Sequence, residues 1–147
     1  MFPPGDVYDD GFGGIDSVQW TMNPWGETSW QEVTEGCYDG SASCIRIDSM
    51  EQWGGLHIYY NQPFPPDTFE TLSLVLKAVD GSGELQLAPS LEGERCIEET
   101  VQVAGNDWIT VEFILSEACA DFDAISAVTL ANNTESFSFL IDAIWFE

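Results

Sequence analysis

The chain has 147 residues, the length of one domain, and 44% of them are hydrophobic, which excludes a disordered acidic tail. Three basic residues stand against 26 acidic ones, so the formal net charge is -23. This charge argues against nucleic acid and anionic membrane surfaces as partners, because both attract lysine and arginine and repel carboxylates.

Short runs of strand-forming residues, separated by Gly, Pro, Asn and Asp, follow one another along the whole chain. In chain order, the predicted strands are 18–22, 43–47, 56–60, 72–77, 84–87, 99–103, 108–115, 127–131 and 137–146. The segment 116–122 has room for one helical turn. Many short strands without a long helical pattern predict an all-β fold, a two-sheet β-sandwich that spans 1–147 as a single domain.

The strand at 56–60, with the residues just before it, has the clearest alternation of side chains. The apolar set, which should face the core, is Leu56, Ile58 and Tyr60. The other set, which should face water or a ligand, is Trp53, Gly55, His57 and Tyr59. A strand with one dry face and rings on the other predicts a binding surface on a sheet.

Basic side chains fall on outward positions of the predicted central strands. Arg46, His57 and Lys77 are three of the four Arg, Lys and His residues, and the amide of Gln86 is also outward. Successive strands of a sandwich often belong to different sheets, so these residues need not share a face.

Four cysteines, an even number, suit disulfides in a secreted protein. Three pairings exist, and the turn at 38–41 favours Cys37 with Cys44, which leaves Cys96 with Cys119. The alternative is four free thiols in a cytosolic protein. A zinc site is disfavoured, because there is no Cys-x-x-Cys and only one histidine. We therefore expect a secreted, extracellular or cell-surface protein.

Motifs in a fixed order resemble the galactose-binding-like jelly-roll carbohydrate-binding modules that are attached to polysaccharide-degrading enzymes and cell-surface proteins. The segments that carry this resemblance are 7–11, Trp20 with 24–26, 36–47, 53–56, 107–111 and 140–144. The last segment departs from the family, which usually has two adjacent acids here, because Ala143 follows Asp142. The resemblance implies a jelly-roll sandwich that binds sugar.

Sugar binding by such a module needs rings that stack on a pyranose and polar groups that bind its hydroxyls. The candidate rings are Trp53, with Gly54 and Gly55 leaving room beside it, and then Tyr59, Trp25 and Trp30. The candidate hydroxyl partners are His57, Lys77, Gln86 and Arg46. Three further tryptophans are expected to be structural: Trp20, Trp108 and Trp145.

The resemblance also implies a structural calcium ion where the first strand, the glycine turn and the closing strand meet. Calcium takes six to eight oxygen ligands. The matching residues are Asp9 or Asp10, Asp39 or Ser41, and Asp142. Since the chain has 26 acids, chance clustering is the alternative.

These observations predict a non-catalytic module that binds a neutral polysaccharide or oligosaccharide, as part of a larger multi-domain secreted protein. The alternative is a structural or adhesive surface protein that self-associates. A glycoside-cleaving enzyme is the third reading, since the chain is rich in carboxylates. It is disfavoured because the acids lie mostly in predicted loops, and His57 has no Gly-x-Ser-x-Gly partner.

Overall fold

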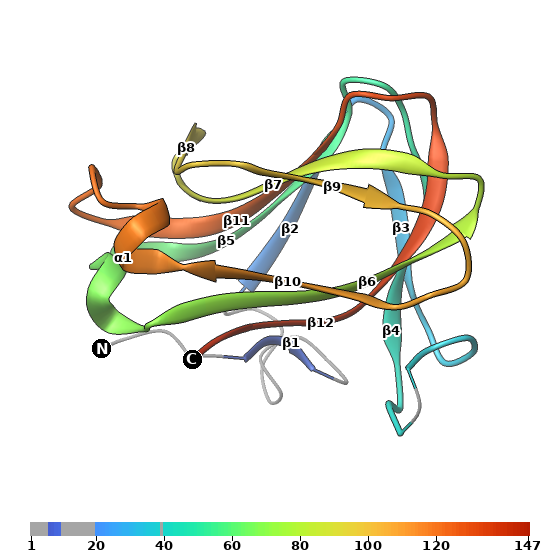
Figure 1. Cartoon of the computed structure of the whole chain (residues 1–147), viewed down its shortest axis with the longest axis horizontal. Helices are drawn as coiled ribbons and strands as arrows, with labels where there is room; N and C mark the ends of the chain where they lie inside the picture. Colours follow the sequence, from blue (N-terminus) through green and yellow to red (C-terminus); the bar gives the residue numbers. More distant parts are fainter. Residues whose placement is uncertain (1–5, 10–19, 39) are drawn as a thin grey trace.

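Two antiparallel sheets pack face to face in the computed structural model, which describes residues 6–9, 20–38 and 40–147 (Figure 1). Sheet A contains β1 (Asp6–Asp9), β3 (Ser29–Val33), β4 (Cys44–Met50), β6 (Thr71–Asp80), β10 (Ile109–Ile114) and β12 (Phe137–Phe146). Sheet B contains β2 (Trp20–Trp25), β5 (Gly55–Phe64), β7 (Gly83–Leu91), β8 (Glu94–Arg95), β9 (Glu99–Val103) and β11 (Ile125–Asn132). Two short turns of helix, η1 (Pro66–Thr68) and α1 (Leu115–Ala118), complete the described elements. Neither has the length and apolar character needed to cross a membrane.

The chain passes repeatedly from one sheet to the other. The strand order is β10-β6-β12-β4-β3 in sheet A and β2-β5-β11-β7-β8 in sheet B. In addition, β1 pairs with β12, and β9 pairs with β7. From β5 to β7, and again from β10 to β12, consecutive strands alternate between the layers, as Figure 1 shows. The predicted all-β sandwich is therefore confirmed, with its strands distributed as in a jelly roll.

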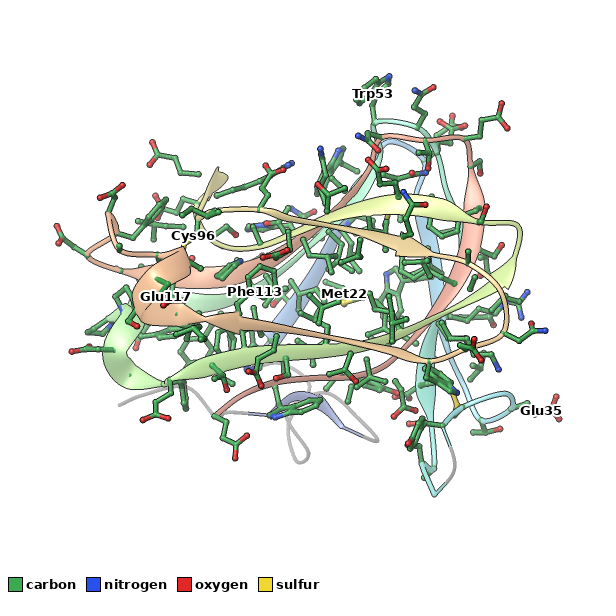
Figure 2. All side chains as sticks on the ribbon, in the orientation of Figure 1. Met22, Glu35, Trp53, Cys96, Phe113 and Glu117 are labelled. Atoms are coloured by element: carbon green, nitrogen blue, oxygen red, sulfur yellow. A yellow bond between two sulfur atoms is a disulfide. The ribbon has the colours of Figure 1, made fainter. Side chains whose placement is uncertain are left out.

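Period-two alternation decides which side chains enter the core. Leu72, Leu74 and Leu76 on β6 are fully buried, and so are Leu56 and Ile58 on β5. Each such side chain contributes about 1.5–3 kcal/mol when it leaves water. Figure 2 shows Phe113 and Met22 between the two layers.

An aromatic cluster closes one end of the core. The buried ring of Trp20 stacks on Phe146 at 5.8 Å and meets Phe64 edge-on at 6.4 Å. The structural role predicted for Trp20 is confirmed. Trp145 is different, because its neighbours Ile144 and Phe146 face the core, so Trp145 lies half-buried on the outer face of sheet A.

Both predicted disulfides are present, Cys37–Cys44 and Cys96–Cys119. The first closes the loop that precedes β4. The second joins the segment after β8, in sheet B, to the residue that follows α1, which itself follows β10 of sheet A. The disulfides therefore fix two connections at the margins of the sheets.

Candidate functional site

The outer face of sheet B has small side chains at its centre. One row of the register joins Asn23, His57, Thr129 and Ala88 across four strands. The rows on either side are Thr21, Tyr59, Ala127 and Ser90, and Trp25, Gly55, Ala131 and Gln86. Because β11 and β7 contribute mainly Ala, Ser and Thr here, the middle of the face is low and its margins are high.

A trough of about 340 Å³ lies on this face. It is lined by Asn23, Trp25, His57, Glu92, Gly93, Arg95 and Thr129, and we call it the sheet B trough. Strand β2 provides one margin, and the turn between β7 and β8 provides the other. The trough thus combines an aromatic ring with amide, hydroxyl, imidazole, carboxylate and guanidinium groups.

Trp25 is held in a fixed orientation at the margin of the trough. Its Nε1–H donates to the carbonyl oxygen of Trp53 at 3.0 Å. Gly55 pairs with Trp25, and a Cβ atom at Gly55 would lie 2.3 Å from Cζ2 of that ring. The missing side chain at Gly55 therefore makes room for Trp25, and not for Trp53 as the sequence suggested.

Trp53 lies in the turn before β5 with 70% of its surface exposed, and Figure 2 shows it at one end of the sandwich, pointing away from both layers. Its φ is +70°, a left-handed conformation that bulky residues rarely adopt. Backbone bonds hold it, because its N–H donates to the carbonyl of Asn132 at 2.6 Å and that of Gly54 donates to Glu51 at 2.9 Å. Backbone strain at a residue whose ring is exposed is typical of functional positions.

His57 lies on the floor of the trough beside Tyr59, as the alternation predicted. The two rings are stacked, with centroids 5.6 Å apart. Nδ1 of His57 lies 3.1 Å from Oγ1 of Thr129. Burial, and then the nearby charge of Arg95, hold the pKa of His57 below its usual value. The imidazole is therefore neutral at pH 7.

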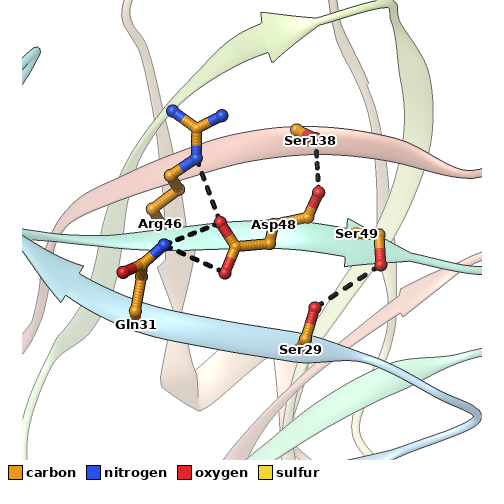
Figure 3. A network of polar contacts seen from close by, with 6 residues as sticks. All are labelled: Ser29, Gln31, Arg46, Asp48, Ser49 and Ser138. Carbon is orange, nitrogen blue, oxygen red and sulfur yellow. Dashed lines mark hydrogen bonds and ion pairs between the residues drawn. The ribbon is translucent and has the colours of Figure 1, made fainter.

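Arg46 lies on the opposite side of the molecule, on the outer face of sheet A. Its Nε donates to Asp48 at 3.1 Å, and Gln31 donates to both oxygens of the same carboxylate at 2.9 and 3.2 Å (Figure 3). These residues line a shallow hollow of about 550 Å³, together with 32–35. The hollow is larger than the sheet B trough but has no aromatic side chain in its lining, so stacking on a sugar is not available there.

Two more candidates are also separated from the trough by the sandwich. Lys77 lies on the outer face of sheet A, with Nζ 5.4 Å from the ring centroid of Trp108. Trp30 pairs with the buried Ile47 and packs against the core, so its ring is not on an open sheet face. Of the predicted sugar-binding residues, the structure brings together Trp25, His57, Tyr59 and Gln86 on sheet B, with Trp53 at the end of that sheet. The other three, Trp30, Arg46 and Lys77, lie away from this face.

Asp142 and Ser41, two of the predicted calcium ligands, do lie together. Asp142 is 94% buried, and its carboxylate accepts hydrogen bonds from the hydroxyl of Ser41 at 2.9 Å and from the N–H of Tyr38 at 3.1 Å. The nearby Sγ atoms of Cys37 and Cys44 form a disulfide and so are not thiolate ligands. Backbone pairing of β1 places Asp9 opposite Ala143. The side chain of Asp9, and Asp10 and Asp39 altogether, lie outside the described residues.

No family model and no curated protein sequence matches the chain. Solved structures do match it. A family 11 carbohydrate-binding module of a cellulosomal cellulase from Clostridium thermocellum superposes with a TM-score of 0.57 at 13% identity, over 90% of this chain and 89% of that one. A family 61 module in complex with β-1,4-galactotriose gives 0.59 at 11% identity, over 94% of both chains. This chain has the jelly-roll fold of carbohydrate-binding modules. The cleaved adhesin domain of Lys-gingipain from Porphyromonas gingivalis has a similar fold, with a TM-score of 0.62 at 12% identity, over 88% of this chain and 90% of that one.

Several residues of the trough had no clear signal in the sequence. Arg95 lies in the two-residue strand β8, and Glu92 lies in the turn before it, too short a hairpin for periodicity to reveal. Thr129 lies in β11, whose eight residues are all buried, so the alternation that marks an outer face is absent there. Asn23 is the one of these residues that the sequence could have indicated, because it lies two positions before Trp25 and therefore shares a strand face with it.

Proposed function

We propose that this jelly-roll module binds an oligosaccharide or polysaccharide chain in the sheet B trough. The observation that carries the proposal is the Trp25 ring, fixed over Gly55 and beside hydrogen-bonding side chains. A rigid ring offers a sugar a large apolar surface at low entropic cost. Asn23, Glu92 and Arg95 then bind hydroxyl groups along the chain.

The ligand is a neutral sugar. Within the trough the positive charge of Arg95 is offset by the carboxylate of Glu98, which lies 3.1 Å from Nη1. A formal charge of -23 on the whole chain repels a polyanion at longer range. A neutral polysaccharide does not need an unpaired positive charge in the trough, and the acidic surface does not repel it.

The module acts without cleaving its ligand. Glycoside hydrolysis uses two carboxyl groups that flank the bond, roughly 5 to 9.5 Å apart. Among the residues that line the trough, Glu92 alone carries a carboxyl group. Release of reducing sugar during incubation with polysaccharide would contradict this part of the proposal.

The two disulfides support a secreted protein, because such bonds persist in oxidising compartments. We further propose that the module is part of a larger multi-domain secreted protein. Affinity electrophoresis in gels that contain β-glucan, xylan or mannan tests the binding itself. We expect at least one polysaccharide to retard the protein. Retardation by none, with self-association at high concentration, would favour the structural or adhesive alternative.

Substitutions at Trp53 separate binding from stability. Trp53→Ala should weaken polysaccharide binding by roughly tenfold, since an exposed ring at the end of sheet B is lost, and should leave the melting temperature nearly unchanged. Trp53→Gly should weaken binding equally, yet raise the free energy of unfolding by up to about 1 kcal/mol, because glycine adopts positive φ without strain. Isothermal titration and thermal melts of both variants check this. A large loss of stability in Trp53→Ala would instead make the ring a packing residue.

We further propose that a calcium ion staples β12 to the neighbouring loop, with Asp142 as a ligand. The close approach of Ser41 to Asp142, and the pairing of the strand that carries Asp9 with β12, support this site. Asp142 and Ser41 offer only part of the six to eight oxygens that calcium needs. The remaining ligands would come from the Asp9 or Asp10 and Asp39 positions.

A chelator should therefore lower the melting temperature by several degrees, and added calcium should restore it. Differential scanning calorimetry before and after dialysis against EDTA measures the effect. In Asp142→Asn, which keeps a hydrogen-bond acceptor but loses the charge, the chelator should have no further effect. An unchanged melting curve in the unsubstituted protein would eliminate the calcium site.

A further inference from the structure

A hydrogen-bonded chain of side chains lies under the floor of the sheet B trough. Nδ1 of His57 lies 3.1 Å from Oγ1 of Thr129, and this oxygen lies 2.8 Å from Oγ of Ser90. Ser90 is fully buried and Thr129 is 96% buried. In the described part of the chain, the Ser90 hydroxyl has no other partner, and Nε2 of His57 has none. Nε2 is therefore the ring nitrogen left for a ligand.

The two hydroxyl protons and the single proton of the neutral imidazole decide in which direction the hydrogen bonds among Ser90, Thr129 and His57 run. If Ser90 donates to Thr129 and Thr129 donates to Nδ1, both hydroxyl protons have acceptors, and the neutral ring carries its proton on Nε2. In the opposite direction, Nδ1–H donates to Thr129 and Thr129 donates to Ser90. The Ser90 proton is then buried without an acceptor. An orphaned buried donor biases the equilibrium by about one to two powers of ten.

We propose that His57 is a fixed hydrogen-bond donor, which presents Nε2–H to an acceptor oxygen of the bound sugar chain. Thr129 is the positioning residue that sets this polarity. The inference rests on the proposed function and deepens it, because it states what the ligand must offer at this point of the trough. A sugar whose hydroxyl or ring oxygen faces His57 is accepted, and one that places an apolar C–H group there is not.

Burial and the nearby positive charge also favour the neutral form of the His57 ring. Burial of the ring, and then the charge of Arg95 on β8, lower the pKa of His57. Glu92 is the carboxylate in the same margin as Arg95, and Tyr59 stacks on the ring. Protonation would place a hydrogen on Nδ1, reverse the bond to Thr129 and leave a buried hydroxyl proton without an acceptor. The neutral Nε2–H form therefore persists at pH 7.

Nuclear magnetic resonance can read this polarity directly, because His57 is the only histidine of the chain. Long-range ¹H–¹⁵N spectra of the ligand-free protein should show one neutral tautomer, protonated at Nε2, and a pKa below the usual value. A ring protonated at Nδ1 would overturn the proposal. This measurement needs no ligand, so it is independent of whether polysaccharide binding itself is found.

Three variants locate the source of the bias. Thr129→Val, which keeps the shape but removes the hydroxyl, should give a mixture of tautomers and raise the pKa of His57. Thr129→Ser should behave as the unsubstituted protein. Ser90→Ala is the matched control, because the Thr129 proton would then be the orphan of the reversed chain, so the tautomer should not change. An unchanged tautomer in Thr129→Val would overturn the role of this residue.

The last step uses the sugar. An oligosaccharide of the β-glucan, xylan or mannan that retards the protein should shift the Nε2–H resonance and slow its exchange with water. Binding without a response at Nε2 would overturn the donor role and leave the proposed function intact. Failure of every polysaccharide to bind, with the tautomer as expected, would instead overturn the proposed function.

Discussion

Replacing Trp25 by alanine should remove most of the affinity for the polysaccharide. The ring forms a margin of the sheet B trough, and both Gly55 and the carbonyl of Trp53 fix its orientation before any ligand arrives. Loss of such a preorganised ring costs about 2 kcal/mol or more, roughly a 30-fold rise in Kd. Isothermal titration, with affinity gels as a second method, measures the change.

Trp145 provides a matched control on the other side of the sandwich. It is also half-buried, and it lies on the outer face of sheet A. Trp145→Ala makes the same chemical change and should leave Kd unaltered. Trp25→Phe keeps an aromatic ring but loses the hydrogen bond to the carbonyl of Trp53. Its Kd should lie between those of Trp25→Ala and Trp145→Ala. A loss of binding in Trp145→Ala, with none in Trp25→Ala, would place the binding face on sheet A.

Strand positions could be predicted because burial follows alternation within a single strand. The predicted segment 137–146 coincides with β12, and 72–77 lies within β6, where three leucines are buried on one face. The strand β3 was missed. This strand is the last one in the order of sheet A, and its sequence, SWQEV, carries exposed polar residues, so it shows little alternation.

The site was harder to predict, because alternation assigns a residue to a face and not to a sheet. His57, Arg46 and Lys77 all occupy outward positions, as the sequence predicted. Strand pairing then places His57 on sheet B and the other two on sheet A. That choice depends on contacts between distant segments, such as β12 with β4 and β6, which no local pattern encodes.

Gly55 illustrates the same limit at the scale of one contact. The sequence alone predicts that the space beside this glycine serves Trp53, which lies two residues before it. Pairing of β2 with β5 brings Trp25 opposite Gly55, so the ring that uses the space comes from another strand. The residue type was informative, and the identity of its partner depended on tertiary structure.

Removal of the Cys96–Cys119 disulfide should have the largest effect on stability. In Cys96→Ala/Cys119→Ala the free energy of unfolding should fall by about 3 kcal/mol, because the bond closes a loop of sequence separation 23. This corresponds to a fall of about 10 °C in Tm. Cys37→Ala/Cys44→Ala, with a separation of 7, should lose about 2 kcal/mol. Urea unfolding of both pairs measures the difference, and the reverse order would contradict the loop-entropy account.

The two disulfide variants should also differ in their affinity for the polysaccharide. Cys96 directly follows Arg95, and its N–H donates to the carbonyl of Pro89 at 2.9 Å, which secures the turn that carries Glu92. Loss of this anchor loosens one margin of the trough, so the Cys96→Ala/Cys119→Ala protein should bind polysaccharide more weakly at temperatures where it remains folded. The Cys37–Cys44 bond lies in the loop before β4, in sheet A, and its removal should leave Kd unchanged. Equal losses of affinity in both proteins would indicate that general destabilisation, and not the margin of the trough, causes the effect.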